Sequence, residues 1–185
     1  MMNKKVIVTG AVIVVIMAMA YGAWNWAIRN PESSPISNSA KVSTIETGIT
    51  VGKMMPQFSL MSLDGQRVTV AKSDQVIVLN FWATWCPPCR EEMPELEQFY
   101  KRYGSTVQFY AINIQEPADK VAGFMKDNQY TFRTAVLLDG DGAVARTYRI
   151  NAIPTSIVID KAGIIRYRTA GTVTLAELEG VLKGL

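Results

Sequence analysis

The sequence predicts an α/β fold, in which helices cover both faces of a mixed β-sheet. Segments with the apolar pattern of strands alternate with segments of helical spacing over residues 76–148, and the chain then ends in a hairpin pattern and a last helix. Strands separated by helices pair in parallel, whereas hairpin strands pair antiparallel, so the sheet contains both kinds of pair. Apolar residues make up 49% of the 185, which is enough to fill one sizeable core.

The first two strands form a predicted hairpin at the start of the globular domain. They run from Phe58 to Leu63 and from Arg67 to Val70, and Asp64-Gly65-Gln66 between them is typical of a turn. The next strand, Val76 to Phe81, is a continuous apolar run, VIVLNF. Such a run is expected of a central strand whose two faces are both covered.

The later elements follow in alternation, and apolar residues at helical spacing mark each helix. Along the chain we expect a helix over 87–103, a strand over 107–114, a helix over 118–128, a strand over 134–138 and a helical turn over 143–148. A second hairpin turns at Lys161-Ala162-Gly163, between strands over 156–160 and 164–169. A helix over 174–185 closes the chain.

The distribution of charge argues against a nucleic-acid partner. The formal net charge of +3 comes from Lys4, Lys5 and Arg29, and the remaining 16 basic side chains balance the 16 acidic ones. A nucleic-acid-binding face needs clustered basic residues, and the sequence contains no such cluster. It also contains no histidine, which excludes His-based catalytic triads and His-containing zinc or copper sites.

The N-terminal segment, residues 1–29, is predicted to enter a membrane. An uncharged, mostly apolar run of about 23 residues ends at Ile28, and this length crosses a hydrocarbon core of about 30 Å. Two lysines precede the run and Arg29 follows it, which favours a cytoplasmic N-terminus and an exported domain. We expect a retained single-pass anchor in the cell membrane, with Trp24 and Trp26 at its interface. Ala18-Met19-Ala20 leaves cleavage as a signal peptide open, and a buried core helix is the remaining alternative.

A linker, residues 30–49, is predicted to join this segment to a domain at 50–185. It is rich in Ser, Thr, Pro and Asn and has no sustained apolar period. If the domain is exported, its cysteines lie in an oxidising environment. A thiol pair there becomes a disulfide unless a reductant keeps it reduced.

The only two cysteines, Cys86 and Cys89, stand in FWATWCPPCR, where a buried strand leads into a helix. Open α/β sheets usually carry their sites at this edge. Pro87 and Pro88 suit the first helical positions, and the positive end of the helix dipole favours the thiolate of Cys86. Cys89 lies one turn into the helix, close enough to form a disulfide but more shielded. The spacing therefore gives one attacking and one resolving thiol.

Three other interpretations of the cysteine pair are weaker. A structural disulfide that closes so small a loop would constrain the unfolded chain very little. A metal site would need ligands beyond two thiolates, and the chain has no other Cys and no His. A one-cysteine peroxidase would show T-x-x-C, whereas Thr84 is only two residues before Cys86. We expect no metal and no cofactor besides the redox-active Cys86–Cys89 disulfide.

The cysteine motif resembles the active site of the thioredoxin superfamily, and other blocks narrow the resemblance. VGKMMPQFSLMSLDGQ, VIVLNFWATWCPPCREEMPEL, YAINI and AIPTSIVIDKAGII follow in the order found in the membrane-anchored TlpA/ResA/StoA group of thiol-disulfide oxidoreductases. The resemblance runs from about Val51 to the C-terminus. It implies a thioredoxin fold with an added N-terminal β-hairpin and a central helix–strand insertion at about Glu116 to Leu138.

The resemblance also assigns residues near the cysteines. Pro154 matches a cis-proline that faces the two thiols, and it leaves the backbone of Ile153 free to pair with a substrate strand. With these two residues, Trp85, Pro87 and Pro88 are the expected substrate contacts.

A carboxylate is the third expected catalytic group. Glu92, three residues after Cys89, matches a glutamate that lies near the thiols in ResA-like proteins and could relay protons. An acidic first turn that only favours the helix is the alternative for Glu92. Asn80 stands where cytoplasmic thioredoxins carry a buried aspartate, which makes Glu92 the better candidate for proton transfer.

The resemblance implies a reductase that works outside the cytoplasm. Cys86 would attack a disulfide in a client protein, and Cys89 would release the product. A membrane thiol-electron carrier would then reduce the Cys86–Cys89 disulfide back to two thiols. The expected client is apocytochrome c during cytochrome c maturation, and the alternative within the family is StoA-like action on spore-envelope proteins. A non-enzymatic thiol or metal chaperone is the alternative from a different class.

Overall fold

The computed structural model describes residues 17–26, 28, 29 and 46–185, which fall into two units, Met1–Ser43 and Thr44–Leu185. In the first unit, residues 17–26 form a helix with exposed large apolar side chains. Much of the predicted membrane segment and most of the predicted linker lie outside the described residues. Among the residues that are described, no helix is long and apolar enough to span a membrane.

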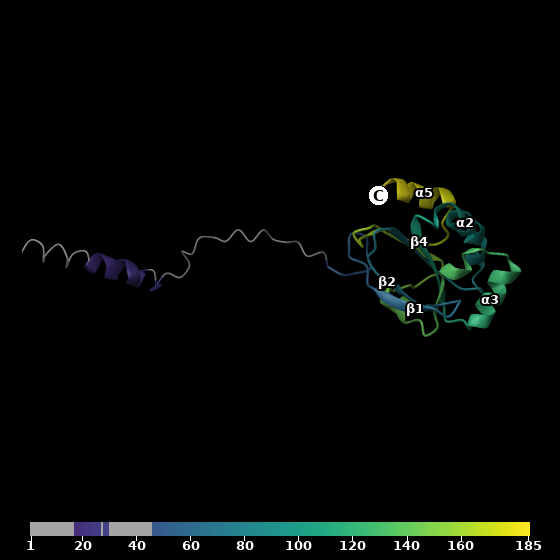
Figure 1. Cartoon of the computed structure of the whole chain (residues 1–185), viewed down its shortest axis with the longest axis horizontal. Helices are drawn as coiled ribbons and strands as arrows, with labels where there is room; N and C mark the ends of the chain where they lie inside the picture. Colours follow the sequence, from purple (N-terminus) through teal and green to yellow (C-terminus); the bar gives the residue numbers. More distant parts are fainter. Residues whose placement is uncertain (1–16, 27, 30–45) are drawn as a thin grey trace, which may run out of the picture. The chain divides into compact units, whose positions relative to one another are not determined.

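A seven-stranded mixed sheet forms the centre of the second unit (Figure 1), with the strand order β2-β1-β5-β4-β3-β6-β7. The strands are β1 (Phe58–Ser62), β2 (Arg67–Val70), β3 (Val76–Trp82), β4 (Val107–Ile114), β5 (Val136–Asp139), β6 (Thr155–Ile159) and β7 (Ile165–Ala170). The pairs β3–β4 and β4–β5 are parallel, and the other pairs are antiparallel. The predicted α/β class with a mixed sheet is confirmed.

Helices lie on both faces of this sheet. They are α2 (Pro87–Tyr103), α3 (Ala118–Asp127), the 3-10 helix η2 (Phe132–Ala135), α4 (Ala143–Thr147) and α5 (Leu175–Lys183). One hydrophobic cluster unites buried side chains of α2, α3 and α5, and a second cluster contains those of α4. Figure 1 shows α5 lying beside α2, which it contacts.

The central strand β3 contributes to both clusters because its side chains alternate between the two faces. Val78 and Trp82 belong to the cluster under α2, whereas Ile77, Leu79 and Phe81 belong to the cluster on the α4 side. Its continuous apolar run is therefore explained by burial on both faces, as predicted.

The inserted segment contains α3, η2 and β5, as the resemblance implied. Strand β5 lies between β4 and β1, so it joins the N-terminal hairpin to the rest of the sheet. The strand predicted at 134–138 begins only at Val136, because η2 occupies the preceding residues and buries Phe132 against Phe109, with ring centroids 5.5 Å apart. The other predicted elements end within two residues of the observed ones.

The globular domain begins earlier than the predicted boundary at residue 50. The carbonyl oxygen of Glu46 accepts the backbone N–H of Met54 at 3.1 Å, and the N–H of Gly48 donates to the carbonyl of Met54 at 2.9 Å. Ile49 packs against the core cluster on the α4 side. Residues 46–49 therefore belong to the domain and not to the linker, a distinction that their polar composition concealed.

Candidate active site

Cys86 lies in the turn between β3 and α2, at the carboxyl edge of the parallel strands. It directly precedes the helix, with φ −87° and ψ 110°, and its sulfur accepts the backbone N–H of Cys89 at 3.3 Å. Pro87 and Pro88 occupy the first two helical positions, where a missing N–H leaves no helical bond unmade. Cys86 and Cys89 form a disulfide with Cα atoms 5.3 Å apart. The turn therefore holds a redox-active pair at the positive end of a helix dipole.

The turn exposes little of either cysteine when they are joined. Cys86 is 3% exposed and Cys89 is fully buried, so the predicted order of exposure holds by a small margin. The neighbours of Cys86 are open: Trp85 is 62% exposed, and Pro87 and Pro88 are exposed as well. A polypeptide that approaches the disulfide would meet these three side chains first.

The loop before β6 covers the other side of the disulfide. Its Ile153–Pro154 peptide bond is cis. The carbonyl oxygen of Ile153 lies 3.7 Å from Cys86 Sγ, and its backbone N–H has no hydrogen-bond partner among the described residues. Ile153 is half-buried, whereas Pro154 is buried, so a client would meet the backbone of Ile153 and not the proline ring.

Glu92 lies under this site, inside the protein. Cys89 and Glu92 are three residues apart on α2, which makes their side chains neighbours on one face of the helix. The carboxylate of Glu92 accepts hydrogen bonds from Asn80 Nδ2 at 2.8 Å and from the backbone N–H of Val173 at 3.0 Å. Burial raises the pKa of Glu92 to about 7, although both hydrogen bonds favour the charged form. Glu92 can therefore gain or lose a proton near neutral pH.

Asn80 links Glu92 to the central strands. Its Nδ2 group also donates to Ser156 Oγ at 3.1 Å, while its Oδ1 atom is buried without a hydrogen-bond partner among the described residues. Asn80 therefore contacts Glu92, the candidate for proton transfer, directly. Neither Ser156 nor Val173 can be identified from the sequence, because their contacts with Asn80 and Glu92 depend on the tertiary fold.

Within the part of the chain that is described, no cluster of three or more His, Cys, Asp or Glu side chains could hold a metal ion. The chemistry available at the turn is that of the disulfide. Attack of a thiolate on one sulfur opens the S–S bond and expels the other sulfur as a thiolate.

Comparison with known proteins places this geometry in a family. The family described as Redoxin matches residues 50–182, a range that includes the cysteine turn, Glu92 and the cis-proline loop. The chain belongs to the Redoxin family. Among curated proteins, the thioredoxin-like protein YneN of Bacillus subtilis (strain 168) is 34% identical over 172 residues, which are 90% of this chain and 92% of YneN. The thiol-disulfide oxidoreductase ResA of Bacillus thuringiensis subsp. konkukian is 34% identical over 76% of this chain and 81% of its own length.

Solved structures agree with this assignment to the Redoxin family. StoA from Bacillus subtilis matches 69% of this chain and 96% of its own with a TM-score of 0.61 and 27% identity. A putative thiol:disulfide interchange protein DsbE from Chlorobium tepidum matches 74% of this chain and 98% of its own, with a TM-score of 0.65 and 28% identity. This redoxin is therefore a thiol-disulfide oxidoreductase with a thioredoxin-like fold.

A second buried carboxylate fixes the turn of this redoxin. Glu116, between β4 and α3, accepts the backbone N–H and the hydroxyl of Thr84, both at 2.6 Å. It also accepts Asn113 Nδ2 at 2.8 Å and pairs with Lys120 Nζ at 2.7 Å. Burial alone would raise the pKa of Glu116, but the hydrogen bonds from Lys120, Thr84 and Asn113 hold it below its ordinary value. An ionised carboxylate therefore fixes the residue two places before Cys86.

This role of Glu116 is not apparent from the sequence. A glutamate followed by a proline at the start of a helix is ordinary helix chemistry, because acids favour the helix N-terminus. The signal that could have identified it is the pairing of β3 with β4, which places the ends of the two strands side by side.

We expect Glu116→Gln to slow alkylation of Cys86 in the reduced protein by about tenfold. Without the hydrogen bonds to Thr84 the turn shifts, and the Cys86 thiolate is no longer held in a reactive position. Glu97→Gln is a matched control. Glu97 accepts the backbone N–H and hydroxyl of Thr131 at 2.9 and 2.7 Å and pairs with Lys101 at 3.0 Å, in the same arrangement. Each variant should lose about 1–3 kcal/mol of unfolding free energy. Equal alkylation rates in the two variants would show that Glu116 is only structural.

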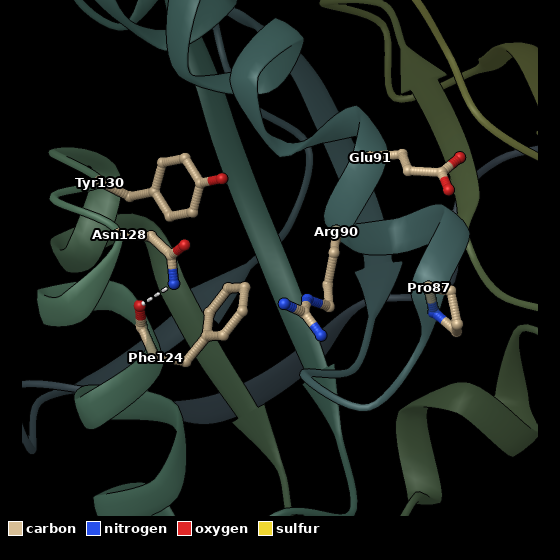
Figure 2. Close-up of a pocket in the computed structure, with 6 residues that line it drawn as sticks. All are labelled: Pro87, Arg90, Glu91, Phe124, Asn128 and Tyr130. Carbon is tan, nitrogen blue, oxygen red and sulfur yellow. Dashed lines mark hydrogen bonds between the residues drawn. The ribbon is translucent and has the colours of Figure 1, made fainter.

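A pocket adjoins Cys86 on the α3 side. It has a volume of about 300 Å³ and is lined by residues of α2, of α3 and of the loop that follows α3: Pro87, Arg90, Glu91, Phe124, Asn128 and Tyr130. In Figure 2, the Arg90 guanidinium extends toward the Phe124 ring, while Glu91 points away from them. Asn128 Nδ2 donates to the Phe124 carbonyl oxygen at 2.8 Å and so caps the C-terminus of α3.

Proposed function

We propose that this protein reduces disulfides in exported client proteins, from an anchored position on the extracytoplasmic side of the cell membrane. One observation carries the proposal: the Cys86–Cys89 disulfide at the N-terminus of α2, whose Cys86 sulfur lies 3.7 Å from the backbone carbonyl oxygen of Ile153. The Redoxin membership and the relatives named as thiol-disulfide oxidoreductases support the reaction class.

The reaction runs as two thiol–disulfide exchanges. In the reduced protein, the Cys86 thiolate attacks one sulfur of the client disulfide, forms a mixed disulfide and releases the other client sulfur as a thiolate. The Cys89 thiolate then attacks Cys86 Sγ and releases the second client sulfur. Two electrons pass to the client, which becomes a dithiol, while the enzyme ends with the Cys86–Cys89 disulfide. A membrane thiol-electron carrier would return the two electrons.

The buried carboxylate suits the second step. Cys89 is fully buried, so its thiol needs a nearby base before it can attack. Glu92 is its neighbour on α2 and has a pKa of about 7, and it can therefore accept this proton near neutral pH. The N-terminus of α2 stabilises the Cys86 thiolate directly, so the two cysteines are activated by different parts of the structure.

The exposed groups around Cys86 would hold the client. The free N–H of Ile153 can pair with an extended client segment, which is the way edge strands recognise peptides. Trp85, Pro87 and Pro88, next to Cys86 in the sequence, offer exposed apolar side chains. Pro154, buried behind the loop, would set the position of Ile153 without touching the client.

The N-terminal segment supports the proposed location. Its apolar composition and flanking charges favour a retained anchor. Of its described residues, 17–26 form a helix that exposes Met17, Met19, Tyr21, Trp24 and Trp26. Reduction of apocytochrome c is the client assignment that we favour. The structural likeness to StoA supports spore-envelope proteins as the second candidate.

Client capture tests the proposed function. We expect the full-length Cys89→Ala variant, expressed in its own cells, to accumulate mixed disulfides with client proteins in the membrane fraction, because the second exchange cannot occur. Mass spectrometry of adducts released by a reductant should identify apocytochromes c. Recovery of spore-envelope proteins alone would replace the favoured client with the second candidate. Adducts found only in the cytosol would contradict the location.

A further inference from the structure

A second pocket includes part of the loop that leads to Ile153. It has a volume of about 310 Å³ and is lined by the end of β4, by α4 and by the following loop: Ile114, Gln115, Gly142, Ala145, Arg146, Arg149, Ile150 and Asn151. No acidic residue belongs to this lining, which contains two arginines and two amides. We refer to this site as the arginine pocket.

The arginine pocket is close to the reacting sulfur. Asn151 precedes Ile153 by two residues, so their Cα atoms are at most about 7 Å apart, and the Ile153 carbonyl oxygen lies 3.7 Å from Cys86 Sγ. Ile114 ends β4, whose residue Asn113 pairs with Trp82 at the end of β3. The pocket therefore opens at the same edge of the sheet as the disulfide, within reach of residues that flank a client cysteine.

The positive charge of the pocket is not neutralised by the fold. Arg146 donates through Nη1 to the carbonyl oxygen of Asp141 at 2.7 Å. Arg168 of β7, which is not part of the lining, donates to the carbonyl oxygens of Tyr148 and Arg149 at 2.8 and 3.3 Å. Among the described residues, none of the three guanidinium groups of Arg146, Arg149 and Arg168 forms an ion pair, in contrast to those of Arg102, Arg133 and Arg166. Arg168 Nη1 is buried without a hydrogen-bond partner among those residues.

Two carboxylates in the turn before α4 form their hydrogen bonds within that turn. Asp139 accepts the backbone N–H groups of Val144 and Ala145 at 3.1 and 2.8 Å, and Asp141 accepts that of Ala143 at 2.9 Å. Both acids thus stabilise the start of α4. The guanidinium groups are left for a partner that lies outside the domain.

The backbone around the pocket adopts uncommon conformations. Gln115 and Arg149 have positive φ values, 54° and 48°, and they are two of the three non-glycine residues with positive φ among those described. A Cβ atom on Gly142 would come within 3.1 Å of Gln115 Cδ and 3.3 Å of Arg146 Nη1. Unfavourable backbone conformations that gather at one place are typical of ligand-binding sites.

We propose that the arginine pocket binds an acidic side chain of the client, next to the client's disulfide, and so selects clients with aspartate or glutamate near their cysteines. Arg146 and Arg149 line the pocket and form no ion pair with a described residue, and this positive charge beside the Cys86 loop identifies the occupant as an acidic group. The inference rests on the proposed reduction of client disulfides and adds a property that the client must have.

Synthetic disulfide peptides test this subsite. Three peptides that differ only in the residues flanking each cysteine, Glu, Gln or Lys, are mixed with the reduced full-length protein in neutral detergent, and the second-order rate of reduction is measured. We expect the Glu peptide to react about tenfold faster than the Lys peptide at low ionic strength, and the ratio to shrink in high salt. In Arg146→Glu/Arg149→Glu the preference should reverse, while the rate for the Gln peptide changes less than about twofold.

Arg67→Glu/Lys72→Glu is the matched control. Both of its residues are exposed, form no ion pair with a described residue, and lie in or next to β2, at the far edge of the sheet, and the charge change is the same. This variant should keep the wild-type preference. A wild-type protein that did not distinguish the peptides, or a control that lost the preference equally, would overturn the subsite. If the wild-type protein reduced none of the three peptides, the proposed function itself would fail, and the subsite with it.

Discussion

Replacing Cys86 by serine should lower the rate of client-disulfide reduction by at least about a thousandfold, the scale of loss when a catalytic nucleophile is removed. A serine hydroxyl at the N-terminus of α2 stays protonated at neutral pH and does not attack a disulfide. Cys89→Ser should behave differently, because Cys86 can still attack. We expect a mixed disulfide to form at nearly the wild-type rate and then to persist. Single-turnover kinetics with a peptide disulfide, followed by mass spectrometry of the intact protein, separate the two steps.

Each variant is the control for the other. Both remove the same disulfide, so any general effect of losing that bond is shared between them. Only the position of the remaining thiol differs. A Cys86→Ser protein that formed mixed disulfides as rapidly as Cys89→Ser would reverse the assignment of attacking and resolving thiols.

Replacing Glu92 by glutamine should change how stability depends on pH. The folded-state pKa of Glu92 is about 7, above its ordinary value of 4.5, so between these values the folded protein holds this proton more tightly than the unfolded chain. Its stabilising contribution is complete below pH 4.5 and is lost as the pH rises through 7, a change of about 3 kcal/mol. In Glu92→Gln this loss should be absent. Urea unfolding of the oxidised proteins from pH 4 to 8 measures it.

The comparison depends on the slope with pH and not on the absolute stability. A glutamine would place an amide N–H against the donors Asn80 Nδ2 or Val173 N–H, and this costs stability at every pH. The difference in unfolding free energy, variant minus wild type, should rise between pH 4.5 and 7 and then level off. Glu91→Gln, a change at an exposed neighbouring carboxylate, should show no such rise. A flat difference for Glu92→Gln would contradict a buried acid that titrates near neutral pH.

The sequence predicts the strands and helices well because their signals are local. The apolar run in β3 reports burial on both faces, and the two prolines after Cys86 mark the first turn of α2 to the residue. The boundary of β5 is less predictable, since η2 forms in order to bury Phe132 among distant rings. The start of the domain at residues 46–49 likewise depends on pairing with Met54 and not on composition.

The same holds for the site: residues marked by local sequence patterns were predictable, and residues defined by tertiary contacts were not. Cys86, Cys89 and their helix could be identified from spacing alone, whereas Glu92 needed a family resemblance, because its burial depends on Asn80 and Val173. The hydrogen bonds of Glu116 with Thr84, and the absence of an ion pair between Arg149 and any described residue, depend on which segments the fold brings together. Charge counts along the chain are balanced and therefore do not reveal an excess of arginine at one edge of the sheet.

Site-specific alkylation of the reduced full-length protein tests the central claim. According to this claim, the fold makes Cys86 the reactive thiolate, and Cys89 is the shielded thiol that reacts only in the second exchange. One equivalent of iodoacetamide is added at pH values from 5 to 9, and the modified residue is identified by peptide mapping. We expect Cys86 to be labelled almost exclusively, with an apparent pKa below the value of about 8.5 for free cysteine. Labelling of Cys89 at an equal rate, or a Cys86 thiol that titrates like free cysteine, would contradict the account.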